Sequence, residues 1–268
     1  MILRNHDIEA TDPQGFVAFV LSRSDRHRSG PGLHRLHSIE VMYAERRSTF
    51  PGAVVWTSTA AEGQTAVLPD GCMDLIWRSG EVVVAGPDSR PYLAAAREGD
   101  QYVGLRCAPG ILPDLLGTPA EELANLRVPL ADVSSDTATA EFLSRIVDAA
   151  DPDRALEDFA RSRRFHGPPR DGRIAAIVRL LEQQASVREV ADYVGIGERQ
   201  LHRLCRRQFG YGPKMLARIL RLQSAMRFAN SSIPAAQAAG MAGYSDQAHL
   251  IREANELTGR TFGQLVTV

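Results

Sequence analysis

The chain has 268 residues, of which 44% are apolar and 24% charged, so it is globular and long enough for two domains. No apolar run reaches the roughly 18 to 20 residues of a membrane span, and the start MILRNHDIEATD lacks the basic and apolar regions of a secretion signal. Three cysteines without CxxC spacing argue against a disulfide framework and against a zinc site. We therefore expect a cytoplasmic protein with no membrane contact, no metal and no cofactor.

The net charge of −1 conceals an uneven distribution along the chain. Residues 161–268 hold 17 Lys and Arg against 8 Asp and Glu, a net charge of +9. Residues 1–160 hold 14 against 24, a net charge of −10. A basic half of this kind indicates that the C-terminal part meets a polyanion such as duplex DNA.

Residues 1–41 give little structural signal, and we treat them as a poorly defined N-terminal extension. Between residues 53 and 107 the apolar pattern has a period of two, in six short runs separated by turn signals: AVVWTST, QTAVLP, CMDLIWR, EVVVAG, RPYLAAA and QYVGLRC. Ser79-Gly80 predicts a tight hairpin between the third and fourth runs. Short strands without intervening helices predict an antiparallel β barrel or sandwich.

Helical patterns follow at about 138–149 and 152–163, and the segment FHGPPRDG at 165–172 interrupts them. The predicted organisation is a strand-rich sensor or dimerisation domain with C-terminal helices over 42–164, a linker over 165–172, and a wholly helical domain over 173–268. The predicted fold class is α+β.

The helical domain contains the pattern of a helix-turn-helix between residues 187 and 210, with Gly195 at the tight bend. Its second helix places four basic residues on one face, at positions i, i+3, i+4 and i+7: Arg199, His202, Arg203 and Arg206. The pattern then repeats, with an offset of 48 residues before the turn and 49 after it. Between the repeats, a helix from Pro213 to about Ala229 is predicted as a rigid strut that holds the two units about one turn of DNA apart.

Three segments of this domain resemble the AraC/XylS family of bacterial transcription regulators: ADYVGIGERQLHRLCRRQFGYGPKML, ARILRLQSAMRFA and AAGMAGYSDQAHLIREANELTGRTFGQL. The resemblance implies two helix-turn-helix units that read two half-elements of double-stranded DNA about 10 base pairs apart. Ala254 stands where the family usually has Phe, so we expect a lightly packed second unit.

The same resemblance assigns roles to individual residues. Those expected to contact bases are Arg199, His202, Arg203, Gln247, Ala248, His249 and Arg252. Those expected to contact phosphates are Arg206, Arg207, Lys214, Arg218 and Arg221. The alternative for any single arginine is a structural ion pair or a solvated surface position.

The strand-rich part resembles the sensor region of a subset of these regulators through VLPDGCMDLIW, VVVAGPDSRP, GLRCAPG, LLGTPAEEL and RVPLADV. This implies control by a small-molecule effector or through a homodimer, and contact with RNA polymerase if the protein is an activator. Effector identity and direction of control stay open. Trp56, Trp77 and Tyr92 are candidates for lining an effector pocket, although aromatic residues in short strands are more often core.

The sequence also bears on three other functions. The stretch from Ser38 to Phe165 contains no histidine, which excludes a histidine-based catalytic triad or a cupin-type metal site there, so we do not expect an enzyme. A cysteine-based redox or alkylation response at Cys72 or Cys107, with a thiolate activated by Arg106, is the main alternative. An RNA-binding or scaffolding role would need exposed aromatic residues, and most aromatics of the basic domain fall at core or turn positions.

Overall fold

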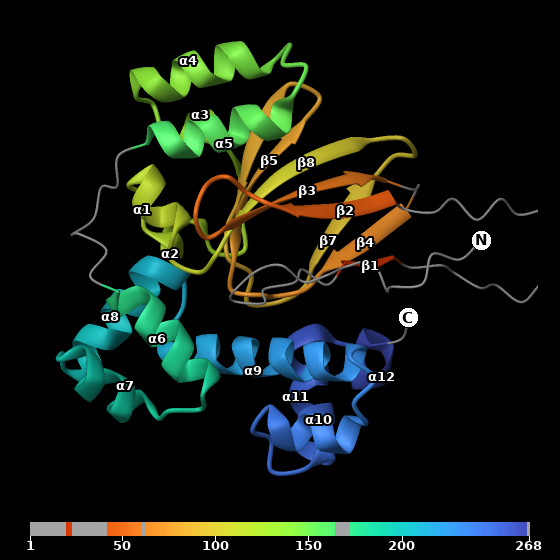
Figure 1. The fold of residues 1–268 in the computed structure, drawn as a ribbon, viewed down its shortest axis with the longest axis vertical. Helices are drawn as coiled ribbons and strands as arrows, with labels where there is room; N and C mark the ends of the chain where they lie inside the picture. The colour runs from red at the N-terminus through yellow and green to blue at the C-terminus, as the bar shows by residue number, and fades with distance from the viewer. Residues whose placement is uncertain (1–19, 23–41, 61–62, 164–171, 267–268) are drawn as a thin grey trace, which may run out of the picture.

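The structure, a computed structural model, describes residues 20–22, 42–60, 63–163 and 172–266 (Figure 1). Most of the predicted extension 1–41 and of the predicted linker 165–172 lies outside these ranges. No helix in the described part of the chain has the length and apolar character needed to cross a bilayer.

Within the described residues, the strand-rich domain contains two antiparallel sheets. Their strands are β1 (Val20–Ser22), β2 (Met42–Arg47), β3 (Ala53–Thr59), β4 (Gly63–Val67), β5 (Met73–Arg78), β6 (Glu81–Ala85), β7 (Tyr92–Ala96), β8 (Gln101–Cys107) and β9 (Arg127–Pro129). One sheet has the order β2-β3-β8-β5-β6-β9 and the other β1-β4-β7. Neither sheet closes on itself, so the sandwich is confirmed and the barrel is not.

Each of the six predicted runs overlaps one strand, from β3 to β8. The predicted hairpin is also present, because Arg78 pairs with Glu81 across Ser79 and Gly80. These two turn residues have φ of 49° and 86°, the left-handed conformations that a type I′ turn requires.

One face of the six-stranded sheet forms the core of this domain. Val55, Leu75, Val84 and Leu105 are paired in register across four strands and are at most 2% exposed. They pack against short helices: α1 (Leu112–Leu116), α2 (Ala120–Leu123), α3 (Leu130–Val133), α4 (Thr137–Ile146) and α5 (Pro152–Ser162). Burial of each such side chain stabilises the fold by about 1.5 to 3 kcal/mol.

The C-terminal domain is wholly helical in the described residues. Its helices are α6 (Arg173–Glu182), α7 (Val187–Val194), α8 (Glu198–Phe209), α9 (Pro213–Asn230), α10 (Ala235–Met241), α11 (Gln247–Thr258) and α12 (Phe262–Leu265). The central helix α9 has 18 residues and is about 27 Å long. Its first half packs with α6 to α8 and its second half with α10 to α12 (Figure 1), so each helix-turn-helix unit has its own apolar cluster on the same helix.

The turn between β4 and β5, residues 68–72, packs along α9 and joins the two domains. Leu68 belongs to the apolar cluster of the second helix-turn-helix unit, and Cys72 to that of the first. Between them, Gln223 Nε2 donates a hydrogen bond of 2.7 Å to the carbonyl oxygen of Pro69. Gly71 has a φ of +86°, which permits the bend that presses the turn against Leu216. One short turn of the strand-rich domain therefore contacts both units.

Candidate nucleic-acid interface

The helix ends in the first helix-turn-helix unit are fixed by local hydrogen bonds and by a glycine. Ser186 Oγ accepts from the backbone N–H of Glu189, whose carboxylate accepts from the N–H of Ser186, and this capping box starts α7. The backbone hydrogen bond to Glu189 lowers the pKa of its carboxyl group. Gly195, with φ of +70°, ends α7 as expected. At the start of α8 the N–H of Gly197 donates to Gln200 Oε1 at 3.0 Å, so Gln200 supports the helix start in place of a capping side chain.

Helix α8 separates a buried face from a basic one. Leu201, Cys205 and Phe209 are at most 1% exposed and pack toward α7 and α9. The four basic residues of the predicted reading face are all exposed: Arg199, His202, Arg203 and Arg206. Together they present cationic and hydrogen-bond donor groups to the solvent.

The second unit repeats this arrangement with different side chains. Asp246 Oδ1 accepts from the N–H of His249 at 2.7 Å and caps α11, and this hydrogen bond lowers the pKa of Asp246. Gln247, Ala248 and Arg252 are exposed as predicted for base-contacting residues. The ring of His249 instead packs edge-on against Tyr244, with centroids 5.1 Å apart.

Ile251 also lies on the exposed face of α11, with 40% of its surface accessible. Ile251 is not among the residues predicted to contact bases, because an apolar side chain in a helix usually belongs to the core. Its spacing of three and four residues from Ala248 and Gln247 was the signal that indicates a shared face.

A buried carboxylate fixes α11 on α9. Glu253, at 6% exposure, accepts hydrogen bonds from Arg218 Nε at 3.0 Å and from Arg221 Nη2 at 2.9 Å. The hydroxyl of Tyr244 donates to the same carboxylate at 3.1 Å. Arg218 also pairs with the exposed Glu256 at 2.6 Å. Arg218 and Arg221, both predicted to contact phosphates, are therefore held in ion pairs between α9 and α11, and their phosphate contacts stay a prediction.

The other predicted phosphate contacts lie on or near the end of α8 that faces the strand-rich domain. Arg206 remains 55% exposed while its Nη2 pairs with Glu121 Oε2 of α2 at 2.7 Å. Gln208 Nε2 donates to Asp114 Oδ1 of α1 at 3.0 Å. Lys214 is exposed at the start of α9. This end of the reading helix is thus in direct contact with the other domain.

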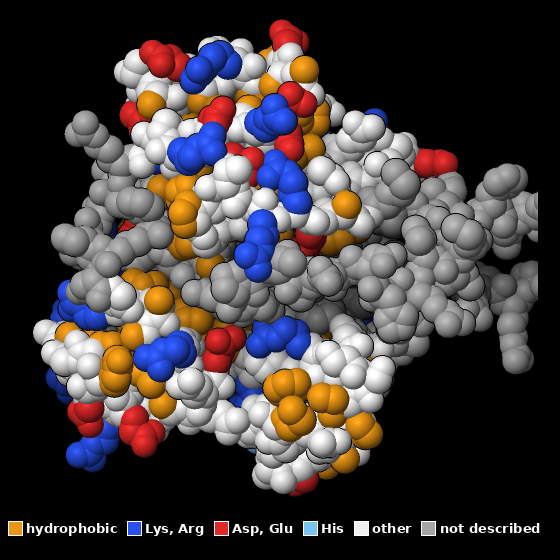
Figure 2. All heavy atoms as spheres, in the orientation of Figure 1, with side chains coloured by type: hydrophobic (Ala, Val, Ile, Leu, Met, Phe, Trp, Pro, Cys, Tyr) orange, Lys and Arg blue, Asp and Glu red, His pale blue; other side chains and the backbone are white. Residues whose placement is uncertain are grey.

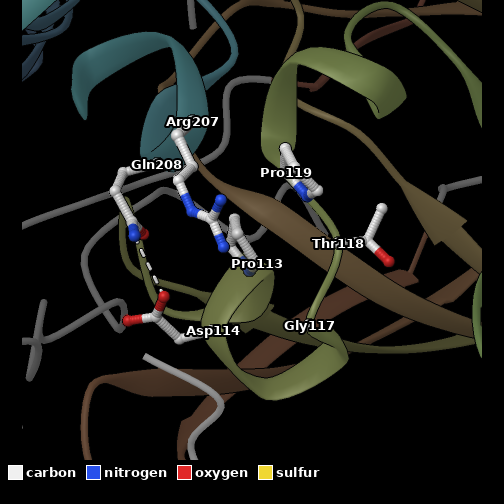
Figure 3. Close-up of a pocket in the computed structure, with 7 residues that line it drawn as sticks. All are labelled: Pro113, Asp114, Gly117, Thr118, Pro119, Arg207 and Gln208. Atoms are coloured by element: carbon white, nitrogen blue, oxygen red, sulfur yellow. Dashed lines mark hydrogen bonds between the residues drawn. The ribbon is translucent and has the colours of Figure 1, made fainter. Parts of the chain in front are cut away.

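Arg207 and Gln208 border a small hollow at this contact (Figure 3). The remaining lining residues are Pro113, Asp114, Gly117, Thr118 and Pro119. Its volume of about 10 Å³ accommodates about one water molecule, so it is too small for an effector.

The aromatic residues proposed to line an effector pocket do not meet. Trp56 pairs in register with Gly104 and Trp77 with Val103, so the two indole rings lie on opposite faces of the six-stranded sheet. Trp77 packs on the helix-covered core, whereas Tyr92 lies beneath the guanidinium of Arg127, 4.0 Å from its ring centroid.

The face of the sheet that carries Trp56 holds a buried charge cluster around Arg106, which is 4% exposed. The guanidinium donates to Glu45 at 2.8 Å and to the Tyr43 hydroxyl at 3.0 Å. Its Nε lies 3.7 Å from Asp74 and 3.8 Å from Asp70. Three carboxylates therefore surround one arginine. Burial raises the pKa of Asp70 to about 6, although Arg106 opposes the shift.

This pKa predicts a pH-dependent effect of Asp70→Asn. Because the folded-state pKa lies above its ordinary value of 3.8, ionised Asp70 destabilises the fold increasingly as the pH rises from about 4 to above 6. We expect the variant to be about 1 to 3 kcal/mol more stable than the parent at pH 7.5 and equal to it near pH 4, measured by urea unfolding. Asp192→Asn, at a side chain 74% exposed, is the control. A less stable Asp70→Asn protein at pH 7.5 would mean that the Arg106 pair is net stabilising.

The cysteines are shielded from solvent. Cys72, Cys107 and Cys205 are all buried and none forms a disulfide. Burial, followed by the nearby Asp70, raises the pKa of Cys72 well above its ordinary value, and Arg106 does not reverse this. Burial also raises the pKa of Cys205 to about 12. The thiolate that a cysteine-based response needs is therefore disfavoured at Cys72.

The exposed faces of α8 and α11, two helices packed on the two halves of α9, form the arrangement of a double helix-turn-helix DNA-binding domain. Comparison with protein families agrees: residues 190–267 match the family described as "Helix-turn-helix domain". The C-terminal region is accordingly an AraC-type helix-turn-helix domain. Residues 53–129 match a domain of unknown function, DUF6597. No curated protein matches the chain.

Solved structures with a similar arrangement include ToxT from Vibrio cholerae. One crystal form of ToxT is 10% identical, with 81% of this chain and 100% of that chain covered and a TM-score of 0.46. Wild-type ToxT of strain SCE256 with bound unsaturated fatty acid is 11% identical, with coverages of 82% and 96% and a TM-score of 0.45.

Proposed function

We propose that this chain is a transcription regulator that binds DNA sequence-specifically, with α8 and α11 entering two adjacent major-groove segments. The main support is the exposure of two equivalent helix faces, one at each end of the 18-residue helix α9. At about 27 Å, α9 suits the roughly 34 Å between successive major-groove faces on one side of a duplex. The proposed role is binding, without catalysis.

The strand-rich domain is proposed as the controlling domain, through an effector or through pairing of two chains. Support comes from its contacts with the reading helix: Glu121 pairs with Arg206, and Asp114 accepts from Gln208. The 68–72 turn adds contacts with both units through α9. A change in how this domain docks would therefore act directly on α8. RNA polymerase is a further partner if the protein is an activator.

The DNA proposal is tested by selection from a random duplex pool with the full-length chain. We expect enrichment of a bipartite motif with two half-elements about 10 base pairs apart. Recovery of no preferred duplex, with binding equal to that of scrambled oligonucleotide, would overturn the proposal.

Within the first unit we expect base and phosphate contacts to respond differently. Arg203→Ala should cost about 1 to 3 kcal/mol on the selected duplex and relax the preference at one base pair. Arg207→Ala should weaken all duplexes similarly and reduce the dependence of affinity on salt. Binding titrations on matched and single-mismatch duplexes at several salt concentrations separate the two. Identical behaviour of both variants would contradict the assignment.

A further inference from the structure

The two reading faces occupy the same register but differ in chemistry. The 49-residue offset aligns Arg203 of α8 with Arg252 of α11, so each face carries one arginine at the same place. Around it, three basic positions of α8 have uncharged counterparts in α11. The aligned pairs are Arg199 with Ala248, His202 with Ile251, and Arg206 with Asn255.

All the residues in these pairs are exposed in the structure. Ile251 is 40% exposed although Leu250 beside it is fully buried, so the unit has an apolar core that does not include Ile251. Ala248 precedes Ile251 by three residues and lies on the same face of α11. The second reading helix therefore offers a small apolar surface beside the amide of Gln247 and the guanidinium of Arg252.

The basic side chains of α8 and the apolar and amide side chains of α11 match different base edges in the major groove. Arginine donates bidentately to the O6 and N7 of guanine, whereas apolar side chains contact the C5 methyl group of thymine and glutamine pairs with adenine. The cationic face of α8 matches guanine-rich edges and adjacent phosphates. The face formed by Gln247, Ala248 and Ile251 matches A·T pairs.

We infer that the two half-elements differ in composition: α8 reads a guanine-containing half, and α11 reads an A·T-containing half through thymine methyl groups at Ala248 and Ile251. The inference rests on the proposed function and adds the class of sequence that each unit prefers. Ile251 is thereby a specificity-determining residue. Because the α11 face carries only Arg252 where α8 carries four basic residues, the first unit is also the main source of phosphate attraction.

The test replaces thymine by uracil, which lacks only the C5 methyl group, in the duplex selected with the full-length chain. Uracil in the half-element bound by α11 should lower affinity about three- to fivefold, because one lost methyl contact costs about 0.8 kcal/mol of binding free energy. Uracil in the other half-element should change it less than about 1.5-fold, because the α8 face predicted to contact bases is formed by basic side chains: Arg199, His202, Arg203 and Arg206.

Ile251→Ala should remove most of the uracil effect, and His202→Ala, at the equivalent position of α8, should leave it intact. Unchanged thermal unfolding of both variants checks that each is folded, as expected for exposed positions. Equal uracil effects in both half-elements, or none in either, would overturn the inference while binding of the selected duplex still upheld the proposed function. Failure to select any duplex would overturn both.

Discussion

Glu253→Ala is expected to destabilise the second helix-turn-helix unit by about 2 to 4 kcal/mol, because it leaves two arginines without their common carboxylate. Glu253 is 6% exposed and joins α11 to Arg218 and Arg221 of α9. The Tyr244 hydroxyl loses its acceptor as well. Urea unfolding of the full-length chain measures the stability change. On the selected duplex, we expect protection of the α11 half-element to fall while the α8 half-element stays protected.

Glu256→Ala is the matched control. Its carboxylate is on the same helix and pairs with the same Arg218, but its side chain is 68% exposed, so we expect a loss of at most about 0.5 kcal/mol. A double-mutant cycle of Glu253→Ala with Arg221→Ala should show a coupling of about 1 to 3 kcal/mol. Equal effects of Glu253→Ala and Glu256→Ala would contradict a positioning role for the buried carboxylate.

Leu68→Ala should cost about 2 to 4 kcal/mol, although residue 68 lies far from the helical domain in sequence. Leu68 is 2% exposed and packs in the second-unit cluster with residues such as Leu222 and Met226. Truncation leaves a cavity between the strand-rich domain and α9. The predicted result is lower stability by urea unfolding together with weaker binding to the α11 half-element.

Leu93→Ala provides the comparison, because Leu93 in the same domain is 58% exposed. It should change stability by less than about 0.5 kcal/mol. If Leu68→Ala proved as mild as Leu93→Ala, or lowered stability without any effect on DNA binding, the 68–72 turn would not couple the two domains.

Local patterns predicted most of the elements. Alternating apolar runs predicted β3 to β8, and Ser79-Gly80 predicted the hairpin. Both signals could be recognised because they depend on residues close in sequence. Strands β2 and β9 were missed for physical reasons. Strand β9 has three residues, and β2 is a polar edge strand held partly by Arg46, which pairs with Glu157 of α5 at 2.9 Å. A long-range ion pair of this kind leaves no periodic signal.

In the candidate site, too, features set by local spacing could be predicted and long-range contacts could not. The exposed faces of α8 and α11 follow from helical spacing alone, and the structure exposes Arg199 and Arg252 as expected. The partners of Arg218 and Arg221 do not follow from spacing, because Glu253 lies more than 30 residues further along the chain. The contact of Leu68 with the second unit could not be predicted either. An apolar residue after a strand indicates that its side chain is buried, but it does not indicate which residues it packs against.

In the proposed function, α8 and α11 are held by the single helix α9 and read two successive major-groove segments on the same side of a duplex. Hydroxyl-radical footprinting of the full-length chain on its selected duplex measures which segments are covered. We expect two protected windows about 10 base pairs apart on one face of the DNA. A single protected window, unchanged by Glu253→Ala and by Ile251→Ala, would contradict the proposed function.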